Sequence, residues 1–306
     1  MEAKVKIRIL LNGKKAQLAP LRVAIDTLRE QHDIEVRVTY EAGDMARLVD
    51  EAIGDNCQRL VAAGGDGTIN EVADALLTHP KASRPALAIL PLGTANDFAA
   101  ACTIPDEPEA ALELALSADA FWIDAIKAND THLINIASGG FGAQVTSTTP
   151  AALKNFLGGG AYTLSGLIQA LSFKPYEGEF IIDGQSASQQ LLLGAVCNGR
   201  QAGGGQVLAP NAYINDGLLD LVALHDFPLE ALSQVIDEFR QPKDDNQYAI
   251  YAQNTAARWR AKSPMPINLD GEPITTSDIT FEVVPNAIKM VLSADCPMLK
   301  PGSEPA

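Results

Sequence analysis

The most constraining feature of this sequence is an apolar run that passes through glycines directly into a helical pattern. Residues 59–63, RLVAA, have the composition of a buried strand, and GGDGT at 64–68 opens the amphipathic run that follows. Glycines at such a junction let backbone N–H groups and the positive end of the helix approach an anion. The stretch therefore predicts an α/β unit with a phosphate site.

A second loop repeats this design. The strand-like run ALAIL at 86–90 leads into PLGTANDF at 91–98, where a glycine and a threonine again precede a helical pattern. Two such turns on neighbouring strands would face one cleft, so we infer a nucleotide site. The chain lacks the Walker A pattern, and Asn70 occupies the third glycine position of a dinucleotide fingerprint, which excludes both templates.

The acidic residues near these loops allow more than one interpretation. Thr68 with Glu71, and Thr94 with Asp97, have capping-box spacing, so they either start their helices or, for Glu71, also belong to the nucleotide site. Asp66 is harder to explain structurally, because a carboxylate among phosphate-binding amides repels the ligand unless it holds Mg²⁺ or meets an arriving hydroxyl. We therefore expect phosphoryl transfer rather than passive binding.

The rhythm of the chain changes near residue 126. Before it, strand and helix patterns alternate, which predicts a doubly wound α/β nucleotide-binding domain over residues 1–127. After it, short strand-like runs broken by Asn-Gly and Asp-Gly pairs predict a β-sandwich or split barrel over residues 128–289. A segment of about 290–300 is expected to return to the first domain.

Composition limits the partners and the compartment. The net charge of −15 argues against nucleic acid and against broad binding to an anionic membrane. The four cysteines have no metal-type or redox-type spacing, and the N-terminus lacks a signal-peptide core, so we expect a reduced, cytoplasmic protein. No apolar run reaches the roughly 18 residues that span a bilayer. We expect a helix over 228–239 and a disordered tail, KPGSEPA at 300–306.

Taken together, the motifs point to a known family. GGDGTINE at 64–71 with PLGTANDF at 91–98 resembles the diacylglycerol-kinase catalytic domain of bacterial lipid kinases and of sphingosine and ceramide kinases. The resemblance covers residues 8–299, and the first motif alone would not suffice, because NAD kinases and phosphofructokinases have similar loops. Three further motifs are similar to the YegS-like branch: NGRQAGGGQ at 198–206, NDGLLDL at 215–221 and LDGEP at 269–273.

The resemblance implies an ATP-dependent lipid kinase with a diacylglycerol-like or phosphatidylglycerol-like acceptor and Mg²⁺, or Ca²⁺ at the same site, as its ion. It implies Glu272 as proton acceptor and a metal site at Asp216 with the backbone carbonyls of Tyr213 and Leu218. Tyr213 replaces a large aliphatic residue that is usual in close relatives, a change that a carbonyl ligand tolerates. The implied ATP-binding residues are Thr39, Gly65, Asp66, Gly67, Thr68, Ile69, Asn70, Glu71 and Thr94.

Each of these roles has a plainer alternative. NLDGEPI at 268–274 has the Asp-Gly signal of a hairpin, although a hairpin can also present Glu272 to a cleft. The turn YINDGLLDL at 213–221 could hold a structural rather than a catalytic ion, and we expect Asp220 to be a solvated strand residue. The loop around Arg200 is either a phosphate cradle or a flexible connection.

The acceptor is the least constrained part of the prediction. Residues 151–171 are apolar and interrupted by glycines, so they form either a core helix or a segment that dips into the membrane interface. We expect transient contact at the inner face of the membrane and no obligate protein partner. The alternatives are a kinase for a sphingoid base, a polyol or NAD, and a nucleotide-responsive binding protein without catalysis. An apolar acceptor pocket in the second domain would favour a lipid over NAD or a sugar.

Overall fold

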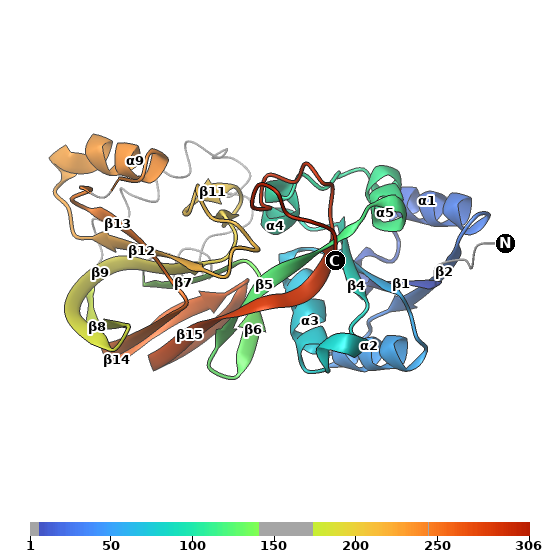
Figure 1. The fold of residues 1–306 in the computed structure, drawn as a ribbon, viewed down its shortest axis with the longest axis horizontal. Helices are drawn as coiled ribbons and strands as arrows, with labels where there is room; N and C mark the ends of the chain where they lie inside the picture. The colour runs from blue at the N-terminus through green and yellow to red at the C-terminus, as the bar shows by residue number, and fades with distance from the viewer. Residues whose placement is uncertain (1–5, 141–173, 244) are drawn as a thin grey trace. The chain divides into compact units, whose positions relative to one another are not determined.

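The computed structural model describes residues 6–140, 174–243 and 245–306, which leaves the predicted interfacial segment 151–171 outside the described residues (Figure 1). The chain forms two compact units. The first runs to Ala125 and includes Pro285–Ala306, and the second comprises Ile126–Val284. The expected fold class, an α/β domain followed by a β-sandwich-like domain, is confirmed.

The first unit is built on a parallel sheet in the order β2-β1-β3-β4. The end of β15 adds to this sheet beside β4, with Met290 opposite Leu87, and β5 pairs with β15. The strand bounds are β1 Lys6–Leu11, β2 Asp33–Val38, β3 Arg59–Gly64, β4 Ala86–Pro91, β5 Ala120–Ala128 and β15 Glu272–Val291.

Helices cover both faces of this sheet, as expected for a doubly wound domain. Figure 1 shows α1 and α5 on one face and α2 and α3 on the other. The helical bounds are η1 Gly13–Lys15, α1 Ala19–Arg29, α2 Asp44–Gly54, α3 Asp66–Leu77, η2 Lys81–Ser83, α4 Asp97–Ala101 and α5 Pro108–Ser117. Because both faces are covered, strands β1, β3 and β4 are almost continuously buried.

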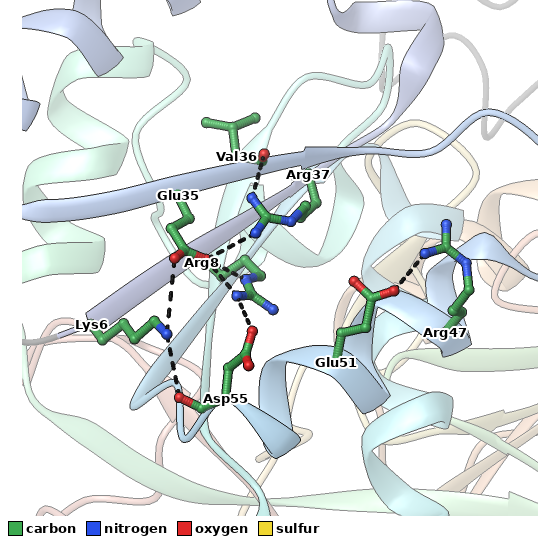
Figure 2. Close-up of polar contacts among 8 residues, drawn as sticks. All are labelled: Lys6, Arg8, Glu35, Val36, Arg37, Arg47, Glu51 and Asp55. Carbon is green, nitrogen blue, oxygen red and sulfur yellow. Dashed lines mark hydrogen bonds and ion pairs between the residues drawn. The ribbon is translucent and has the colours of Figure 1, made fainter.

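One charged side chain interrupts this core. Arg8 of β1 is only 1% exposed, and it bonds to Glu35 of β2 and to Asp55 after α2, with 2.6 Å between its Nη2 and the Asp55 Oδ2 (Figure 2). The guanidinium lowers the pKa of Glu35 and of Asp55 through these hydrogen bonds. A buried cation is tolerated here because two carboxylates, both reaching solvent, face it.

The second unit is mostly antiparallel. Strand β9 pairs with β7 and β8, and β14 also pairs with β7 and β8, so these four strands form a closed ring around an apolar core. Strands β12 and β13 extend the sheet beyond β9. The bounds are β6 Thr131–Leu133, β7 Ile136–Gly140, β8 Tyr176–Ile182, β9 Gln185–Cys197, β10 Gln201–Ala202, β11 Gln206–Val207, β12 Leu219–His225, β13 Ala249–Asn254 and β14 Ala256–Leu269.

The expected helix over 228–239 and the expected disordered tail have different outcomes. The helix expected over 228–239 is present as η3 Leu229–Ala231 followed by α9 Leu232–Arg240. The tail expected to be disordered is instead bound, because the Ala306 N–H donates to the Ala120 carbonyl at 2.7 Å. Buried Met298 and Leu299 hold the segment just before it. Across the described helices, none combines the length and the apolar character needed to cross a membrane.

Candidate nucleotide and metal sites

The strand order of the first unit marks the place where a ligand would bind. From β1 the chain continues to β2 on one side of the sheet, and from β3 it continues to β4 on the other side, so the strand order reverses between β1 and β3. Ligands of such sheets bind beyond the carboxyl ends of the strands at that point. Asn12 follows β1, and its Nδ2 donates to the Thr68 Oγ1 beyond β3 at 3.2 Å. Sequence analysis missed Asn12, although its position directly after a predicted strand was a usable signal.

The two glycine loops lie against each other at the same edge. The Leu92 N–H donates to the Gly64 carbonyl at 2.7 Å. A Cβ added to Gly93 would lie 2.6 Å from the Gly65 Cα, which is closer than any real contact. Glycine is required at 93 because the backbones themselves touch. The sequence prediction that both loops face one place is supported by this contact.

Asp66 bonds to the start of α4. Its Oδ2 accepts the N–H of Asp97 and its Oδ1 accepts the N–H of Phe98, each at 3.1 Å. The carboxylate thus joins the first glycine loop to the second and satisfies N–H groups that a helix start leaves free. Each oxygen of a carboxylate has two lone-pair sites, so these bonds leave room for a cation. A role for Asp66 in holding Mg²⁺ stays a prediction.

The two stretches with capping-box spacing do not form capping boxes. Helix α3 begins at Asp66, with Gly65 as its N-cap, so Thr68 lies within the helix and its side chain packs against Gly64. Helix α4 begins at Asp97, and among the described residues its N-cap, Asn96, makes no capping bond with its own side chain. The physical reason is tertiary: Asp66, from the neighbouring loop, supplies the acceptors at the start of α4.

A cleft of about 880 Å³ lies in the first unit beside these loops, and it brings together Thr39 and Glu71 from the predicted ATP set. Thr39 Oγ1 accepts the Gly13 N–H at 3.2 Å, and Tyr40 beside it is 97% exposed. The other polar and charged lining residues are Asn12, Lys14, Glu41, Asp50, Asp74 and Thr78.

The remaining predicted ATP residues lie outside the lining of this cleft. Thr94 is exposed on the second loop, and Gly65 and Gly67 are half-buried on the first. Ile69 and Asn70 are buried side chains, so they would reach a nucleotide through their backbone alone.

Asp44 holds one wall of the cleft. Its Oδ2 accepts the N–H groups of Tyr40 at 2.7 Å and Glu41 at 3.0 Å, and its Oδ1 accepts Arg47 Nη2 at 2.7 Å. The Arg47 guanidinium, followed by these two N–H groups, lowers the pKa of Asp44 to about 2. The loop after β2 is thereby kept in one conformation.

In the second unit, Glu272 lies on a hairpin, as the sequence indicated. Asp270 and Gly271 form the turn, with φ of 47° and 103°, and Leu269 pairs with Glu272. Glu272 is exposed at the first position of β15. Its role as proton acceptor stays a prediction.

Asp270, which sequence analysis treated only as a turn residue, anchors that hairpin. Its carboxylate accepts the N–H groups of Ile134 and Asn135 at 2.9 Å and of Ile136 at 2.7 Å. It is 8% exposed, so these bonds replace hydration that burial removes. The direction in which the turn presents Glu272 is therefore set by Asp270.

The predicted metal loop is a turn around Gly217, whose φ is 76°. Asp216 Oδ1 accepts the Leu218 N–H at 3.1 Å. Arg200 Nε donates to the Ala212 carbonyl at 2.8 Å, and the guanidinium lies 5.3 Å from the centre of the Tyr213 ring. In the part of the chain that the structure describes, no group of three or more His, Cys, Asp or Glu side chains could hold a metal. An ion at Asp216 would thus depend on carbonyl oxygens.

Asp220 differs from expectation, because it is buried rather than solvated. It is 8% exposed in β12, and its Oδ1 accepts Gln253 Nε2 at 3.1 Å. Burial, and then the charge of Asp216, raise its pKa to about 6 against the opposing effects of Gln253 and Arg200. Among the described residues its Oδ2 has no hydrogen-bond partner. Such an orphaned oxygen fits a hard cation, which prefers oxygen ligands.

The ring of the second unit encloses an apolar cavity of about 30 Å³. Phe180 and Leu191 separate it from an open groove of about 360 Å³ on the same unit, because both residues line both spaces. Apart from Ser138, Tyr176 and Trp259, the lining residues of the cavity have apolar side chains or are glycines. The interior of this ring is therefore apolar.

Comparison with known proteins agrees with this geometry. Residues 6–128 match the diacylglycerol kinase catalytic domain, and residues 135–292 match the YegS C-terminal NAD kinase beta sandwich-like domain. A protein of Shewanella frigidimarina named probable lipid kinase YegS-like is 48% identical over 96% of each chain. The chain belongs to the YegS-like family of lipid kinases. Another family member, the probable lipid kinase YegS of Salmonella arizonae, is 43% identical over 95% of this chain and 97% of its own.

Solved structures show the same fold as this YegS-like chain. A diacylglycerol kinase structure from Bacillus anthracis superposes with a TM-score of 0.72 at 21% identity, covering 97% of this chain and 100% of that one. A second structure from the same organism superposes with a TM-score of 0.79 at 23% identity, covering 96% and 98%. At these identities the likeness concerns the fold alone.

Proposed function

We propose that this protein transfers the γ-phosphoryl group of ATP to a hydroxyl of a membrane lipid of the diacylglycerol or phosphatidylglycerol kind, in an Mg²⁺-dependent reaction of phospholipid metabolism. The observation that carries the proposal is the backbone contact of the two glycine loops, Gly65 against Gly93, within the region that matches a diacylglycerol kinase catalytic domain. Two glycine turns in contact offer many N–H groups to the phosphates of one nucleotide.

The roles of the nucleotide-site residues follow from their places. The N–H groups of Gly67 and Thr68 at the start of α3 would hold phosphate oxygens, because the intrahelical bonds begin at the Ile69 N–H. Thr39 and Glu71 would contact the remainder of ATP in the cleft. Asp66 would keep both loops in register through its bonds to α4. Phosphoryl transfer needs this kind of positioning and charge stabilisation more than covalent participation by the protein.

Glu272 and Asp216 would complete the chemistry. Glu272, exposed at the tip of the hairpin, would accept the hydroxyl proton as a general base, a contribution of about 10²–10⁴-fold. Asp216, with the carbonyls of Tyr213 and Leu218, would hold a divalent ion. When bound, such an ion supplies positive charge that structures the loop or neutralises phosphate.

The apolar interior of the ring in the second unit supports a lipid acceptor over NAD, a sugar or another polyol. Its cavity of about 30 Å³ is too small for an acyl chain in this conformation. An acyl chain would therefore enter by displacing Phe180 or Leu191 from the wall shared with the open groove. The net charge of −15 supports brief contact with a membrane rather than permanent residence.

The decisive experiment incubates the protein with γ-labelled ATP, Mg²⁺ and a total lipid extract, in parallel with a water-soluble metabolite extract. Label in a lipid product is the expected result. Label only in a polar product would show that the acceptor is a soluble alcohol rather than a lipid. ATP binding without any labelled product would indicate a nucleotide-responsive binding protein.

Two variants sharpen this assay. Glu272→Gln should abolish turnover while ATP still binds, because it removes the base without touching the loops. Glu282→Gln changes an exposed carboxylate on the same strand and should retain wild-type turnover. Wild-type rates in Glu272→Gln would remove Glu272 from the reaction.

A further inference from the structure

Asp220 stands out as an incompletely satisfied buried charge in the second unit. It is 8% exposed, and its Oδ1 accepts one hydrogen bond, at 3.1 Å, from the neutral amide of Gln253. Within the described ranges its Oδ2 has no hydrogen-bond partner. A buried carboxylate oxygen without a partner is costly, so native proteins normally supply a donor, a water or a cation.

The strands place this side chain next to the loop that contains Asp216. Asp220 is opposite Cys197 of β9 and Gln253 of β13, so it lies in the interior of the sheet rather than at its edge. The Asp216 carboxylate is close enough to repel the charge of Asp220. Both acids therefore lie at one end of β12, on either side of Leu218.

Arg200, the neighbouring cationic side chain, does not form an ion pair with the carboxylate of Asp216 or of Asp220 within the described residues. Arg200 attracts Asp220 electrostatically. Its Nε, however, donates to the Ala212 carbonyl, and its guanidinium lies over the Tyr213 ring. The described part of the chain contains no ion pair between Arg200 and either acid by the usual 4 Å criterion. One guanidinium near two carboxylates leaves a net negative charge that would attract a divalent cation.

We propose that Asp220 is the second carboxylate of the divalent cation site at Asp216, with its Oδ2 holding the ion or a water molecule of its coordination shell. The inference rests on the proposed function only for the existence of that site. Two carboxylates and two carbonyls form an all-oxygen donor set of the type that Mg²⁺ and Ca²⁺ prefer. A carboxylate that supports a ligated ion in this way changes affinity by about 10–100-fold when it is replaced.

The test measures cation binding by the full chain without ATP or lipid. Protein stripped with a chelator is titrated with Mg²⁺ and with Ca²⁺, and binding is followed by calorimetry and by the melting temperature. Wild type should bind and be stabilised, and Asp220→Asn should bind at least about 10-fold more weakly. Without cation, Asp220→Asn should be at least as stable as wild type, because asparagine still accepts from Gln253 and no charge is buried.

The matched control is Asp226→Asn, which changes an exposed aspartate just after the same strand and should bind like wild type. Equal affinities for wild type and Asp220→Asn would overturn the proposal, as would a wild type that shows neither heat nor stabilisation. If Asp220→Asn does not fold, Asp220→Glu is used, which keeps the charge and displaces the oxygens. An altered ratio of Ca²⁺ to Mg²⁺ affinity in Asp220→Glu supports the proposal, and an unaltered ratio overturns it.

The kinase assay separates this inference from the proposed function. A protein that binds cations through Asp220 but labels no lipid would contradict the lipid kinase assignment and still support the second carboxylate. Lipid labelling by the wild type, together with unchanged cation affinity in Asp220→Asn, would support the lipid kinase assignment and contradict the role of Asp220 as second carboxylate.

Discussion

Gly93 and Gly65 touch backbone to backbone: a Cβ on Gly93 would lie 2.6 Å from the Gly65 Cα. The contact joins the loop after β3 to the loop after β4, so it defines the geometry of the proposed phosphate site. The Cβ would also lie 2.5 Å from the Asn96 Oδ1. The Gly65 atom belongs to the backbone, so it can move only if a whole loop moves. The contact therefore excludes every side chain at position 93.

Gly93→Ala should lower the free energy of unfolding by about 1–3 kcal/mol, the usual cost of overpacking. It should also weaken ATP binding, because the two loops would separate. Denaturant unfolding and ATP titration measure the two effects.

Gly67→Ala is the control for that change. A Cβ at Gly67 meets no described atom within 4 Å, and the residue is helical, so alanine there should be neutral or slightly stabilising. Equal stabilities of the two variants would show that the loops do not depend on the contact.

Asp270→Ala should be among the most destabilising changes in the second unit. It would strip the acceptor from three buried backbone N–H groups, at about 1–3 kcal/mol for each unsatisfied group. We expect a loss of roughly 3 kcal/mol or more, together with lower turnover, because the turn that presents Glu272 would lose its anchor.

Asp226→Ala tests whether that loss is specific. This exposed aspartate bonds to the N–H of the next residue, Phe227, and its removal should change stability by less than about 1 kcal/mol. A small effect in both variants would contradict the role given to Asp270.

Glu35→Gln should destabilise the protein by about 1–3 kcal/mol, because Arg8, at 1% exposure, would lose part of its charge compensation. The comparison is Glu51→Gln, which breaks the Arg47–Glu51 pair that Figure 2 also draws. Both side chains of this pair are about half exposed. That change should cost under about 1 kcal/mol. Thermal unfolding of both variants checks the order, and a larger loss in Glu51→Gln would contradict it.

The Asp44 carboxylate should make the stability of the folded protein depend on pH in the acidic range. Its pKa is lowered from 3.8 to about 2 in the folded protein, chiefly by Arg47. A carboxyl with a lowered pKa stabilises the fold above its ordinary value, and this contribution disappears as pH falls from about 4 to about 2.

Asp44→Asn should therefore melt below wild type at pH 7, and the difference should shrink as pH falls below about 4. Asp26→Asn, an exposed residue paired with Arg29 at 3.4 Å, should stay close to wild type at each pH. A melting difference for Asp44→Asn that does not change with pH would contradict the assignment.

The sequence by itself determined the elements whose signals are local. Buried strands are runs of apolar residues, glycines mark the two loops, and Asp270-Gly271 marks a hairpin, because each conformation is favoured by residues adjacent in the chain. The family motifs are equally local, which is why an α/β domain followed by a sandwich-like domain could be predicted from the order of residues alone.

Only the tertiary structure decided which distant groups meet. Thr68 has the spacing of a helix cap, yet its hydroxyl accepts from Asn12, and the acceptors for α4 come from Asp66 at the start of α3. Asp220 is a charged residue within an apolar run and is expected to be solvated, yet β9 and β13 bury it. Burial and hydrogen-bond partners depend on which strands and loops become neighbours in space. That arrangement is a property of the folded chain rather than of any short stretch of sequence.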